Sequence, residues 1–316
     1  MSERADPTVE IRRATHDDYD AVAAFTGEIW DDRGGDYIPD VYHDWLEDAP
    51  GQGKKTFLAE VDGEAAGIVQ GVMLSPDEAW FQGMRVARSH RRQGVSQRLN
   101  QALFDWASER GAAVARVMIF SWNVASFGAS RASGYEPITE FRFAHPEPDL
   151  DAAGPDPVSN DPAAAWRYWT HSDARDRLDG LGLAPEESWA VRELTRDDFD
   201  RLADETAVFA VESDAGLAGA AYRSRTYERP VDDGSDDSSD GGGTERWAEY
   251  GVGAWDDVEA ARSLFAAIGR DAGACDADRT RVLIPETARY VTDAPYAGAD
   301  VSEEPDFVLG IDLTSR

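Results

Sequence analysis

The segment from Gln82 to Ser96 constrains the fold of this chain more than any other. An apolar strand is expected to end at Val86, a turn containing Gly94 follows, and an amphipathic helix begins at once. Such a turn directs several backbone N–H groups one way, and the helix dipole adds partial positive charge there. The arginines gathered in and beside this segment are Arg85, Arg88, Arg91, Arg92 and Arg98. The segment therefore predicts a strand–turn–helix unit and a site for a phosphate-bearing ligand.

The rest of the chain is strongly acidic, with a formal net charge of −31 and a pI near 4.3. A surface of this charge is not expected to bind nucleic acid. Lys54 and Lys55 are the only lysines, so nearly all of the positive charge is arginine. Aspartate-rich, lysine-poor surfaces are typical of proteins that stay dissolved in molar salt, where the Debye length falls to about 3 Å. We therefore expect a halophilic, haloarchaeal protein rather than a merely acidic one.

Several classes of site are not expected. Cys275 is the only cysteine, so the chain forms no internal disulfide and no cysteine-based metal cluster. The five histidines are scattered singly, and no metal is predicted. The first residues lack the apolar core of a signal peptide, and no apolar run approaches the ~20 residues of a membrane span. We expect a cytoplasmic monomer or homodimer that does not bind a membrane.

Three segments recur in the same order along the chain, which predicts an internal duplication. The pairs are Ile11–Asp20 with Val191–Asp200, Phe57–Glu60 with Phe209–Glu212, and Arg116–Ile119 with Arg281–Ile284. In the first pair, a strand precedes a helix capped by Thr15 or Thr195, with aspartates in the first turn. The chain is therefore expected to contain two related domains.

The predicted domain boundaries are 8–147 for the first domain, 148–185 for a linker, and 186–316 for the second domain. The linker is expected to contain a helix anchored by Trp166 and Trp169. The second domain is interrupted by an acidic loop at 232–244, rich in Asp, Ser and Gly, which is not expected to carry chemistry. In the first domain, the expected strands are 9–14, 56–61, 65–74, 78–86, 114–121 and 135–144, and the expected helices are 16–29, 38–47, 94–110 and 124–133.

With strand, turn and helix in this order, residues 9–145 resemble the GNAT superfamily of acyl-CoA-dependent N-acetyltransferases. The family's pyrophosphate motif is Gln or Arg, two residues, Gly, one residue, then Gly or Ala. Residues Arg91–Ser96 match it, with Ser96 in place of the final Gly or Ala. Asn123 after the next strand and the Gly134–Tyr135 pair match further family features. The resemblance implies an acetyltransferase domain in the first copy.

The second copy looks like an eroded GNAT-like domain. Tyr250–Val252 stands where Met84–Val86 stands in the first copy, but Ala254–Asp257 follows, without an arginine turn. This second domain is not expected to hold coenzyme A. The resemblance thus implies an α/β fold with a mixed sheet, in two tandem GNAT-like domains of which the second is degenerate.

The resemblance also implies that acetyl-CoA is the co-substrate and an amine the acceptor. Backbone N–H groups in the turn would hold the pyrophosphate, and an N–H near Met84 or Arg85 would polarise the thioester carbonyl. Asn123 either contacts the coenzyme or simply caps the following helix. The candidate cofactor-binding residues are Met84, Arg85, Val86, Arg91, Arg92, Gln93, Gly94, Val95, Ser96, Asn123 and Ser126.

The catalytic residues follow less directly from this resemblance, because two family positions differ. Gln82 stands where the family often has a glutamate base, and Ser130 stands where it has a tyrosine acid. Glu78 is the first candidate for the base, with Asp77 and His90 behind it; alternatively, a weakly basic acceptor needs no base. The expected function is acetyl transfer to a primary amine through a tetrahedral intermediate. The alternative is a non-catalytic acyl-CoA-binding regulator.

Aromatic residues in the region of the first two helices offer two interpretations. Trp30, Tyr37 and Tyr42 are candidates for lining the acceptor pocket, together with Trp45. Aromatic residues at these spacings are also common in a hydrophobic core. The sequence leaves the two alternatives open.

Overall fold

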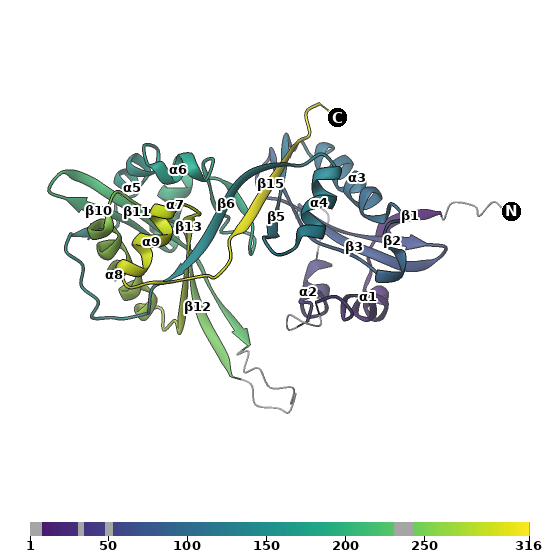
Figure 1. Cartoon of the computed structure of the whole chain (residues 1–316), viewed down its shortest axis with the longest axis horizontal. Coiled ribbons are helices and arrows are strands. Elements are labelled where there is room, and N and C mark those ends of the chain that lie inside the picture. The colour runs from purple at the N-terminus through teal and green to yellow at the C-terminus, as the bar shows by residue number, and fades with distance from the viewer. Residues whose placement is uncertain (1–7, 31–34, 48–52, 231–242, 316) are drawn as a thin grey trace. The chain divides into compact units, whose positions relative to one another are not determined.

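The computed structural model describes residues 8–30, 35–47, 53–230 and 243–315. The chain divides into two compact units (Figure 1). The first unit comprises Met1–Ile119, Asn123–Pro137 and Leu309–Arg316, and the second comprises Phe120–Trp122 and Ile138–Val308. Each unit therefore includes a segment that lies far away in the sequence.

The first unit is built on a sheet with the strand order β1-β2-β3-β4-β5. Neighbours from β1 to β4 are antiparallel, whereas β4 and β5 are parallel. The C-terminal part of β15, from Leu309 onward, lies beside β5 and completes this sheet. The strands are β1 Val9–Arg13, β2 Lys54–Val61, β3 Glu64–Met73, β4 Glu78–Val86, β5 Val114–Phe120 and β15 Asp306–Asp312.

Helices cover both faces of this sheet, with α1 and α2 on one side and α3 and α4 on the other (Figure 1). For this reason β3 is buried along most of its length and is almost continuously apolar. The amphipathic pattern predicted for α3 is confirmed, because Val95, Leu99, Leu103 and Trp106 are buried on one side. The helices are α1 Tyr19–Thr26, α2 Ile38–Trp45, α3 Val95–Ser108 and α4 Val124–Ala132.

The predicted elements of the first copy are confirmed in type and order. One helix differs in detail, because the segment predicted as a helix over 16–29 begins with a short 3-10 helix, His16–Asp18. The regular helix α1 then ends at Thr26, earlier than predicted. The fold class, a mixed α/β sheet covered by helices, is as expected.

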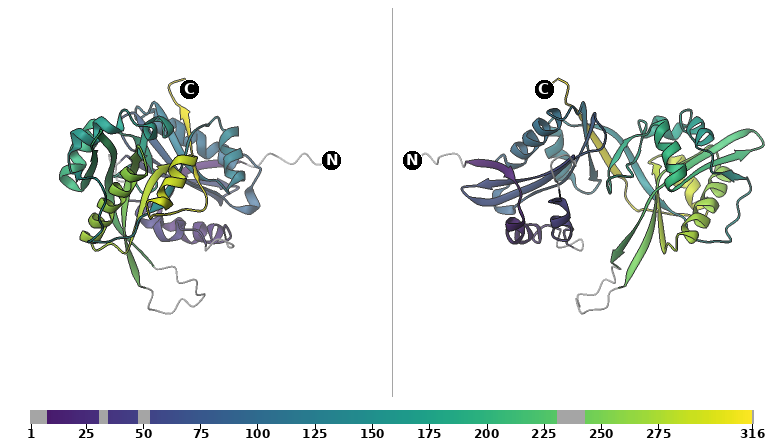
Figure 2. Two further views of the ribbon diagram at one scale, coloured as in Figure 1. Left: turned by 60° about the vertical axis from the view of Figure 1, so that its left-hand side comes forward. Right: turned by 180° about the vertical axis from the view of Figure 1, so that it is seen from behind.

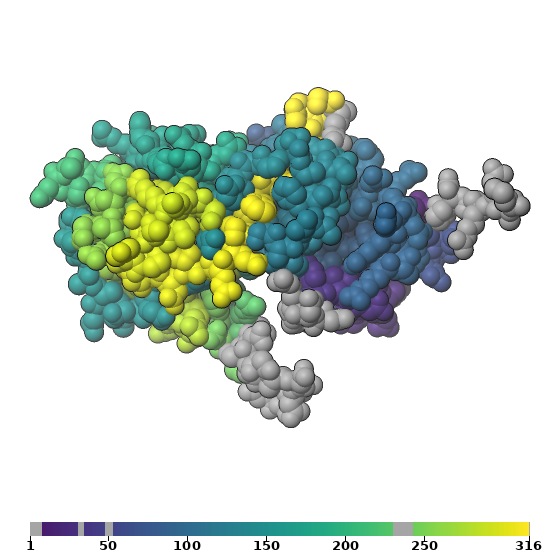
Figure 3. Space-filling model, viewed as in Figure 1, coloured from purple at the N-terminus to yellow at the C-terminus, as the bar shows by residue number. Residues whose placement is uncertain are grey.

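The second unit has the strand order β6-β13-β12-β11-β10-β7, with β14 also beside β6. Figure 2 shows the strands and helices of this unit, mostly teal, green and yellow, from two further sides. Its helix α8 packs against β10, β11 and β12, and α5 and α7 pack against β10 and β11. The residues of α9 and β14, yellow in Figure 3, form part of the surface of this unit. The strands are β6 Glu136–His145, β7 Val158–Ser159, β10 Ala207–Ser213, β11 Gly216–Pro230, β12 Thr244–Trp255, β13 Arg279–Pro285 and β14 Asp300–Val301, and the helices are α5 Pro162–Trp169, α6 Asp173–Arg177, α7 Arg196–Glu205, α8 Val258–Ala274 and α9 Ala288–Tyr296.

Two local details recur in both units and support the duplication. A β-bulge follows Ala59 in β2, which lies opposite Gly67, and an equivalent bulge follows Val211 in β10, which lies opposite Gly219. These positions correspond in the sequence repeat, so the same irregularity occurs at the same place. A bulge is conserved in position only where the surrounding packing is also shared.

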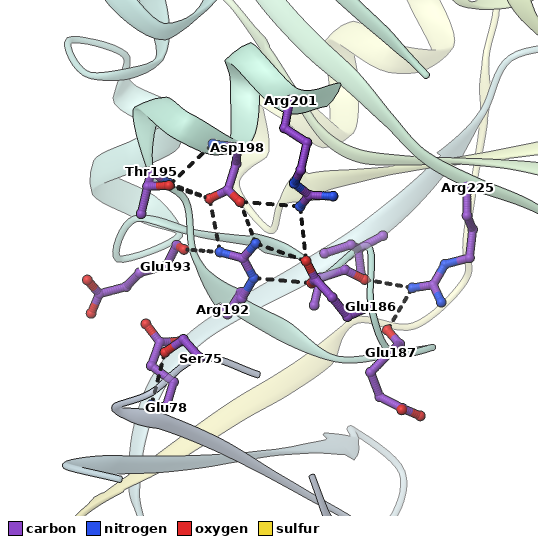
Figure 4. Close-up of polar contacts among 12 residues, drawn as sticks. Ser75, Glu78, Glu186, Glu187, Arg192, Glu193, Thr195, Asp198, Arg201 and Arg225 are labelled. Carbon is purple, nitrogen blue, oxygen red and sulfur yellow. Dashed lines mark hydrogen bonds and ion pairs between the residues drawn. The ribbon is translucent and has the colours of Figure 1, made fainter. Parts of the chain in front are cut away.

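The second recurring detail is an arginine–aspartate pair before the first helix. Arg12 donates to Asp18 with both Nη atoms, at 2.8 and 2.6 Å. Arg192 makes the same contacts with Asp198, at 2.9 and 2.5 Å (Figure 4). Thr195 caps α7 and accepts a hydrogen bond from the Asp198 N–H, as the sequence predicts.

The register of the second sheet corrects one sequence correspondence. Val86 lies opposite Gly67, and Trp255 lies opposite the equivalent Gly219. The residues that correspond to Met84–Val86 are therefore Gly253–Trp255, three residues later than the sequence comparison suggests. Pairing with a neighbouring strand fixes this register, and the sequence motif alone does not.

The predicted linker is part of the second unit. Its strand β7 pairs with β10, with Val158 opposite Val211, and its helix α5 buries Trp169 completely. Strand β9 (Val191–Glu193), the counterpart of β1, instead pairs with β8 (Leu181–Leu183) in a separate two-stranded sheet. The linker thus occupies the edge position that β1 takes in the first unit.

The sheet of each unit also includes a strand that belongs, in the sequence, to the other copy of the repeat. In the second unit, β6 pairs with β13, with Leu283 opposite Phe143, although β6 belongs to the first copy in sequence. In the first unit, the C-terminal end of the chain lies beside β5, and the Leu313 N–H donates to the Ala113 carbonyl at 2.8 Å. The compact units therefore differ from the predicted boundaries of 8–147 and 186–316.

Two further properties concern the described residues only. No helix among them is long and apolar enough to cross a membrane. No group of three or more His, Cys, Asp or Glu side chains among them is arranged to hold a metal ion. Most of the predicted acidic loop, residues 232–242, lies outside the described residues, and β12 begins at Thr244.

Candidate functional site

The parallel strands β4 and β5 are paired only at their beginnings. The ladder runs from Glu78 opposite Val114 to Trp80 opposite Arg116. Both strands continue beyond it, β4 to Val86 and β5 to Phe120, and both are fully described. Backbone groups of β4 after Trp80 are therefore not used in this ladder.

A bulge in β4 coincides with the end of this pairing. Ile68 lies opposite Arg85 and Gln70 lies opposite Gln82, so β4 has one extra residue between them. Gly83 adopts a φ of +64° there, and a Cβ on Gly83 would lie 2.1 Å from the Trp45 ring. Only glycine fits both conditions, because other residues would be strained and would clash.

A small cavity of about 50 Å³ opens between the separated strands and the helices α3 and α4. Its lining is mostly apolar, with a few hydroxyl and amide groups. A narrow slot of this composition suits an alkyl chain with amide groups better than a charged ligand. The lining residues are Val69, Phe81, Gln82, Met84, Ser96, Asn100, Leu103, Val117, Ser126, Ala129, Ser130 and Tyr135.

The turn that precedes α3 leaves the helix N-terminus without a side-chain cap. Gly94 occupies the N-cap position with a φ of +81°, and it has no side chain to accept from the first N–H groups. Arg92 also has a positive φ, of 64°. The arginines of this region with exposed side chains are Arg88, Arg91, Arg92 and Arg98. Uncapped N–H groups, the helix dipole and these guanidinium groups together favour an anion.

Two other predicted residues of this turn make local contacts. Arg91 Nε donates to the Val86 carbonyl at 3.4 Å, and Gln93 Nε2 donates to the Ser89 carbonyl at 3.0 Å. Val95 is buried beneath the turn, while Ser96 faces the cavity. The predicted motif is therefore one continuous structure from the end of β4 to the first turn of α3.

Arg85 points away from the predicted cofactor side. Its side chain is buried and pairs with Asp36, with Nε–Oδ2 at 2.5 Å and Nη2–Oδ1 at 3.2 Å. The guanidinium also stacks on Trp30, 3.9 Å from the ring centroid, and lies 5.4 Å from the Tyr37 centroid. Only the backbone N–H of Arg85 can therefore serve the predicted role of polarising the thioester carbonyl. Trp30 and Tyr37 lie together, because both rings contact the Arg85 guanidinium.

Tyr42 is part of the hydrophobic core and does not join Trp30 and Tyr37. Its side chain is fully buried in a cluster that includes Val22 and Ile38. Its hydroxyl donates to the Thr15 carbonyl at 2.6 Å, and burial raises the pKa of Tyr42 to about 12. For Tyr42, the core interpretation describes the structure, because the helix α2 places it toward the sheet.

Glu78 is not brought to the cavity. It is buried and forms an ion pair with Arg116, with Oε2 and Nη1 2.8 Å apart. It lies at the paired end of β4, four residues or about 13 Å along the strand from Gln82. The other candidates for the base also make local contacts, Asp77 with Ser75 and His90 with Ser89.

Gln82 and Ser130, which replace the family's usual base and acid, both line the cavity. Tyr135 lies there too, and its hydroxyl donates to Asn100 Oδ1 at 3.3 Å. Asn123 caps α4, and its Oδ1 accepts from the Ser126 N–H at 3.2 Å. Asn123 thus has the capping role, and Ser126 reaches the cavity as a neighbour of Ser130.

Sequence reasoning missed two parts of this site. Gln70, fully buried in β3, contacts Gln82, and a glutamine in an otherwise apolar strand is a usable signal. Gly83 was also missed, although an isolated glycine within a strand indicates a bulge. Asn100 and Tyr135 come together from α3 and the start of β6, which the sequence does not relate.

The first unit is a mixed sheet covered by helices, in which the parallel strands β4 and β5 separate beyond their first residues. The family model of the acetyltransferase (GNAT) family matches residues 16–135. The matched residues lie almost entirely in the first unit, so this unit has the fold of the GNAT acetyltransferases.

Solved structures share the fold at low sequence identity. A GCN5-related N-acetyltransferase from Sphaerobacter thermophilus is similar over 96% of this chain and 96% of its own, with 14% identity and a TM-score of 0.59. The GCN5-related glucosamine N-acetyltransferase region of a fungal multi-domain GH3 β-N-acetylglucosaminidase is similar over 97% of this chain and 38% of its own, with 14% identity and a TM-score of 0.56. A comparison with curated proteins gave no match.

Proposed function

We propose that the first unit transfers an acetyl group from acetyl-CoA to a primary amine. The observation that carries this proposal is the cavity between β4 and β5, which opens beside the uncapped, arginine-rich N-terminus of α3. A slot with amide and hydroxyl groups suits the pantetheine arm, and the helix N-terminus suits the pyrophosphate. The two parts are adjacent because Ser96 belongs to both.

The proposed contacts with acetyl-CoA are mostly made by the backbone. N–H groups from Arg91 to Ser96 would bind the pyrophosphate, assisted by the side chains of Arg91 and Arg92. Backbone groups of Met84 and Val86, beyond the β4–β5 ladder, would bind the pantetheine amides. Ser126 would contribute from α4, which Asn123 holds in place through its cap.

The proposed chemistry is direct attack of a neutral amine on the thioester carbonyl. The backbone N–H of Met84 or Arg85 would stabilise the negative charge on the tetrahedral intermediate. Ser130 is a weaker proton donor than the family's tyrosine. This replacement is compatible with turnover, because a thiol of pKa near 8.5 leaves largely as the thiolate.

A second candidate function is a regulator that binds acyl-CoA without turnover. The observation that favours it is the presence of Gln82 and Ser130 in the cavity, where a family member with both catalytic groups has an ionisable base and a phenol. The two candidates agree on binding and differ on chemistry. Release of coenzyme A over a panel of primary amines in molar KCl separates them.

Binding is tested with a Gly94→Asp variant, whose carboxylate would cap α3 and repel phosphates. Calorimetric titration with acetyl-CoA should show an affinity roughly 100-fold weaker than in the unchanged protein. The control is Gly63→Asp, at a glycine with a similar φ of +86°, where a Cβ would meet no described atom within 4 Å. Equal affinity in both variants would contradict the proposed site.

A further inference from the structure

Three strands contribute to a chain of hydrogen bonds that ends at Gln82. Gln82 Nε2 donates to Gln70 Oε1 at 2.8 Å. Gln70 Nε2 donates to the Trp45 carbonyl and to Thr56 Oγ1, both at 3.1 Å. Thr56 Oγ1 donates to the same Trp45 carbonyl at 3.1 Å. Gln70 and Thr56 are completely buried, so their orientation is set by these contacts.

The backbone carbonyl of Trp45 fixes the direction of the whole chain. A carbonyl oxygen only accepts, so Gln70 must turn its Nε2 toward Trp45 and its Oε1 toward Gln82. That Oε1 also only accepts, so Gln82 must donate with its Nε2. The other hydrogen-bonding atom of the Gln82 side chain is Oε1, an acceptor, on a residue that lines the cavity.

This arrangement of hydrogen bonds favours an amide side chain over a carboxylate at position 82. An ionised glutamate would place an acceptor oxygen against Gln70 Oε1, which leaves both without a proton between them. The amide accepts a hydrogen bond but does not take a proton near neutral pH. The carboxylates of Glu78 and Asp36 are each paired with an arginine.

We propose that Gln82 Oε1 positions the acceptor amine and that the acceptors are amines partly unprotonated near neutral pH, such as α-amino groups, rather than strongly basic alkyl amines. This inference rests on the proposed acetyl transfer and deepens it. Gln82 thus acts by accepting a hydrogen bond from the amine N–H and not by removing its proton.

The reaction balances without a protein base. The lone pair of the neutral amine forms the C–N bond at the thioester carbonyl, giving a tetrahedral oxyanion with a protonated nitrogen. The proton on this nitrogen passes to water, and the collapse of the oxyanion breaks the C–S bond. Coenzyme A leaves as the thiolate and the amide remains. The protonation of the acceptor therefore controls the rate.

The pH dependence of kcat/KM tests this proposal on two amines, alaninamide as an α-amine and Nα-acetyl-lysine amide as an ε-amine. Their pKa values are about 8 and 10.4. Coenzyme A release between pH 6.5 and 9.5 should level off near pH 8 for the α-amine and keep rising for the ε-amine. The ratio of the two kcat/KM values should fall about 30-fold over this range, which follows from the free-base fractions.

Each outcome of this measurement decides one question. If both profiles level off at one shared pH below 8, a protein group takes the proton and the inference is overturned. If acetyl-CoA binds but neither amine is acetylated, the acceptor class is wrong. If acetyl-CoA does not bind at all, the proposed function itself fails.

Variants of Gln82 separate positioning from a structural role. Gln82→Met removes the acceptor atom, and the KM for the amine should rise at least about tenfold, a larger change than that in acetyl-CoA affinity. Gln82→Glu should lower the melting temperature. It should also add an inflection at one common pH to the kcat/KM profiles of both amines. The matched control is Gln101→Glu, an exposed residue of α3, which should leave both profiles unchanged. Equal effects on the amine and acetyl-CoA constants would contradict positioning by Gln82.

Discussion

The helices α3 and α8 follow corresponding strands but begin in opposite ways. Eight residues, 87–94, separate β4 from α3, and the last of them, Gly94, offers no cap. Only Asp256 and Asp257 separate β12 from α8, and Asp257 Oδ1 accepts from the N–H groups of Glu259 and Ala260 at 3.0 and 2.9 Å. The same backbone groups are left for a ligand in one unit and are consumed by a side chain in the other.

The same fold therefore has two different arrangements at the N-terminus of the corresponding helix, one with a capping side chain and one without. A capping aspartate stabilises a helix and places negative charge where a phosphate would have to bind. The second unit therefore has a stabilising cap at this position, whereas the first leaves these N–H groups uncapped, as the proposed phosphate site requires. The buried ion pairs also differ, because Glu249 in the second unit pairs with two arginines, whereas Glu78 in the first unit pairs with Arg116.

The largest expected effect concerns the ion pairs of Glu249. Glu249 is fully buried and pairs with Arg225, at 2.8 Å, and with Arg281. Glu249→Gln should lower the free energy of unfolding by roughly 3 kcal/mol, because the buried Arg281 and the partly buried Arg225 lose their counter-charge. Glu78→Gln, which leaves one guanidinium, should lower it less. Denaturant unfolding measures both changes.

The Glu78→Gln variant also tests whether Glu78 acts in catalysis. We expect Glu78→Gln to change stability but not the pH dependence of kcat/KM, since Glu78 is paired with Arg116 away from the cavity. A variant with unchanged stability and no turnover would restore Glu78 as the base.

The next largest expected effect is the loss of stabilisation by the two arginine–aspartate pairs at acidic pH. A hydrogen bond from Arg12 lowers the pKa of Asp18 to about 2. Burial would raise the pKa of Asp198, but hydrogen bonds from Arg192 and Thr195 lower it to about 2. Both folded-state values lie below the unfolded value near 3.9, so this stabilisation is present above pH 4 and is lost as the pH falls toward 2.

Asparagine variants measure these contributions. At pH 6, Asp198→Asn should lower the free energy of unfolding by about 2 kcal/mol, and Asp18→Asn by about 1 kcal/mol, since solvent screens the half-exposed Arg12. Both differences should shrink in urea titrations between pH 4 and 2. Differences that stay constant over this range would show that the ionisation of these pairs does not stabilise the units.

The smallest effect concerns the cap of α8. Asp257→Ala should lower the free energy of unfolding by about 1 kcal/mol, the usual value of an N-cap, and leave acetyl-CoA affinity unchanged. The matched control is Asp161→Ala at the cap of α5, where Asp161 accepts from Ala163 and Ala164. Calorimetric titration should give one acetyl-CoA per chain. A second equivalent would remove the distinction between the two units.

Much of the first unit was predictable because its signals are local. Apolar periodicity located its strands and helices, and the Gly94 turn located the anion site. The failures involve contacts between distant residues. Glu78 was a reasonable base by its place on the strand, but its pairing with Arg116 depends on the neighbouring strand. Tyr42 was a candidate for a pocket that the packing of α2 does not allow it to reach.

The sequence by itself determined which segments become strands and helices and where the turn into α3 leaves its N–H groups uncapped. Periodicity, capping residues and glycine act over a few neighbouring residues, so the chain specifies them locally. Tertiary structure alone decided the register of β12, the strand that completes each sheet, and the direction of the amide at Gln82. These depend on which distant groups meet, as when the Trp45 carbonyl orients Gln70, and a linear pattern does not contain that information.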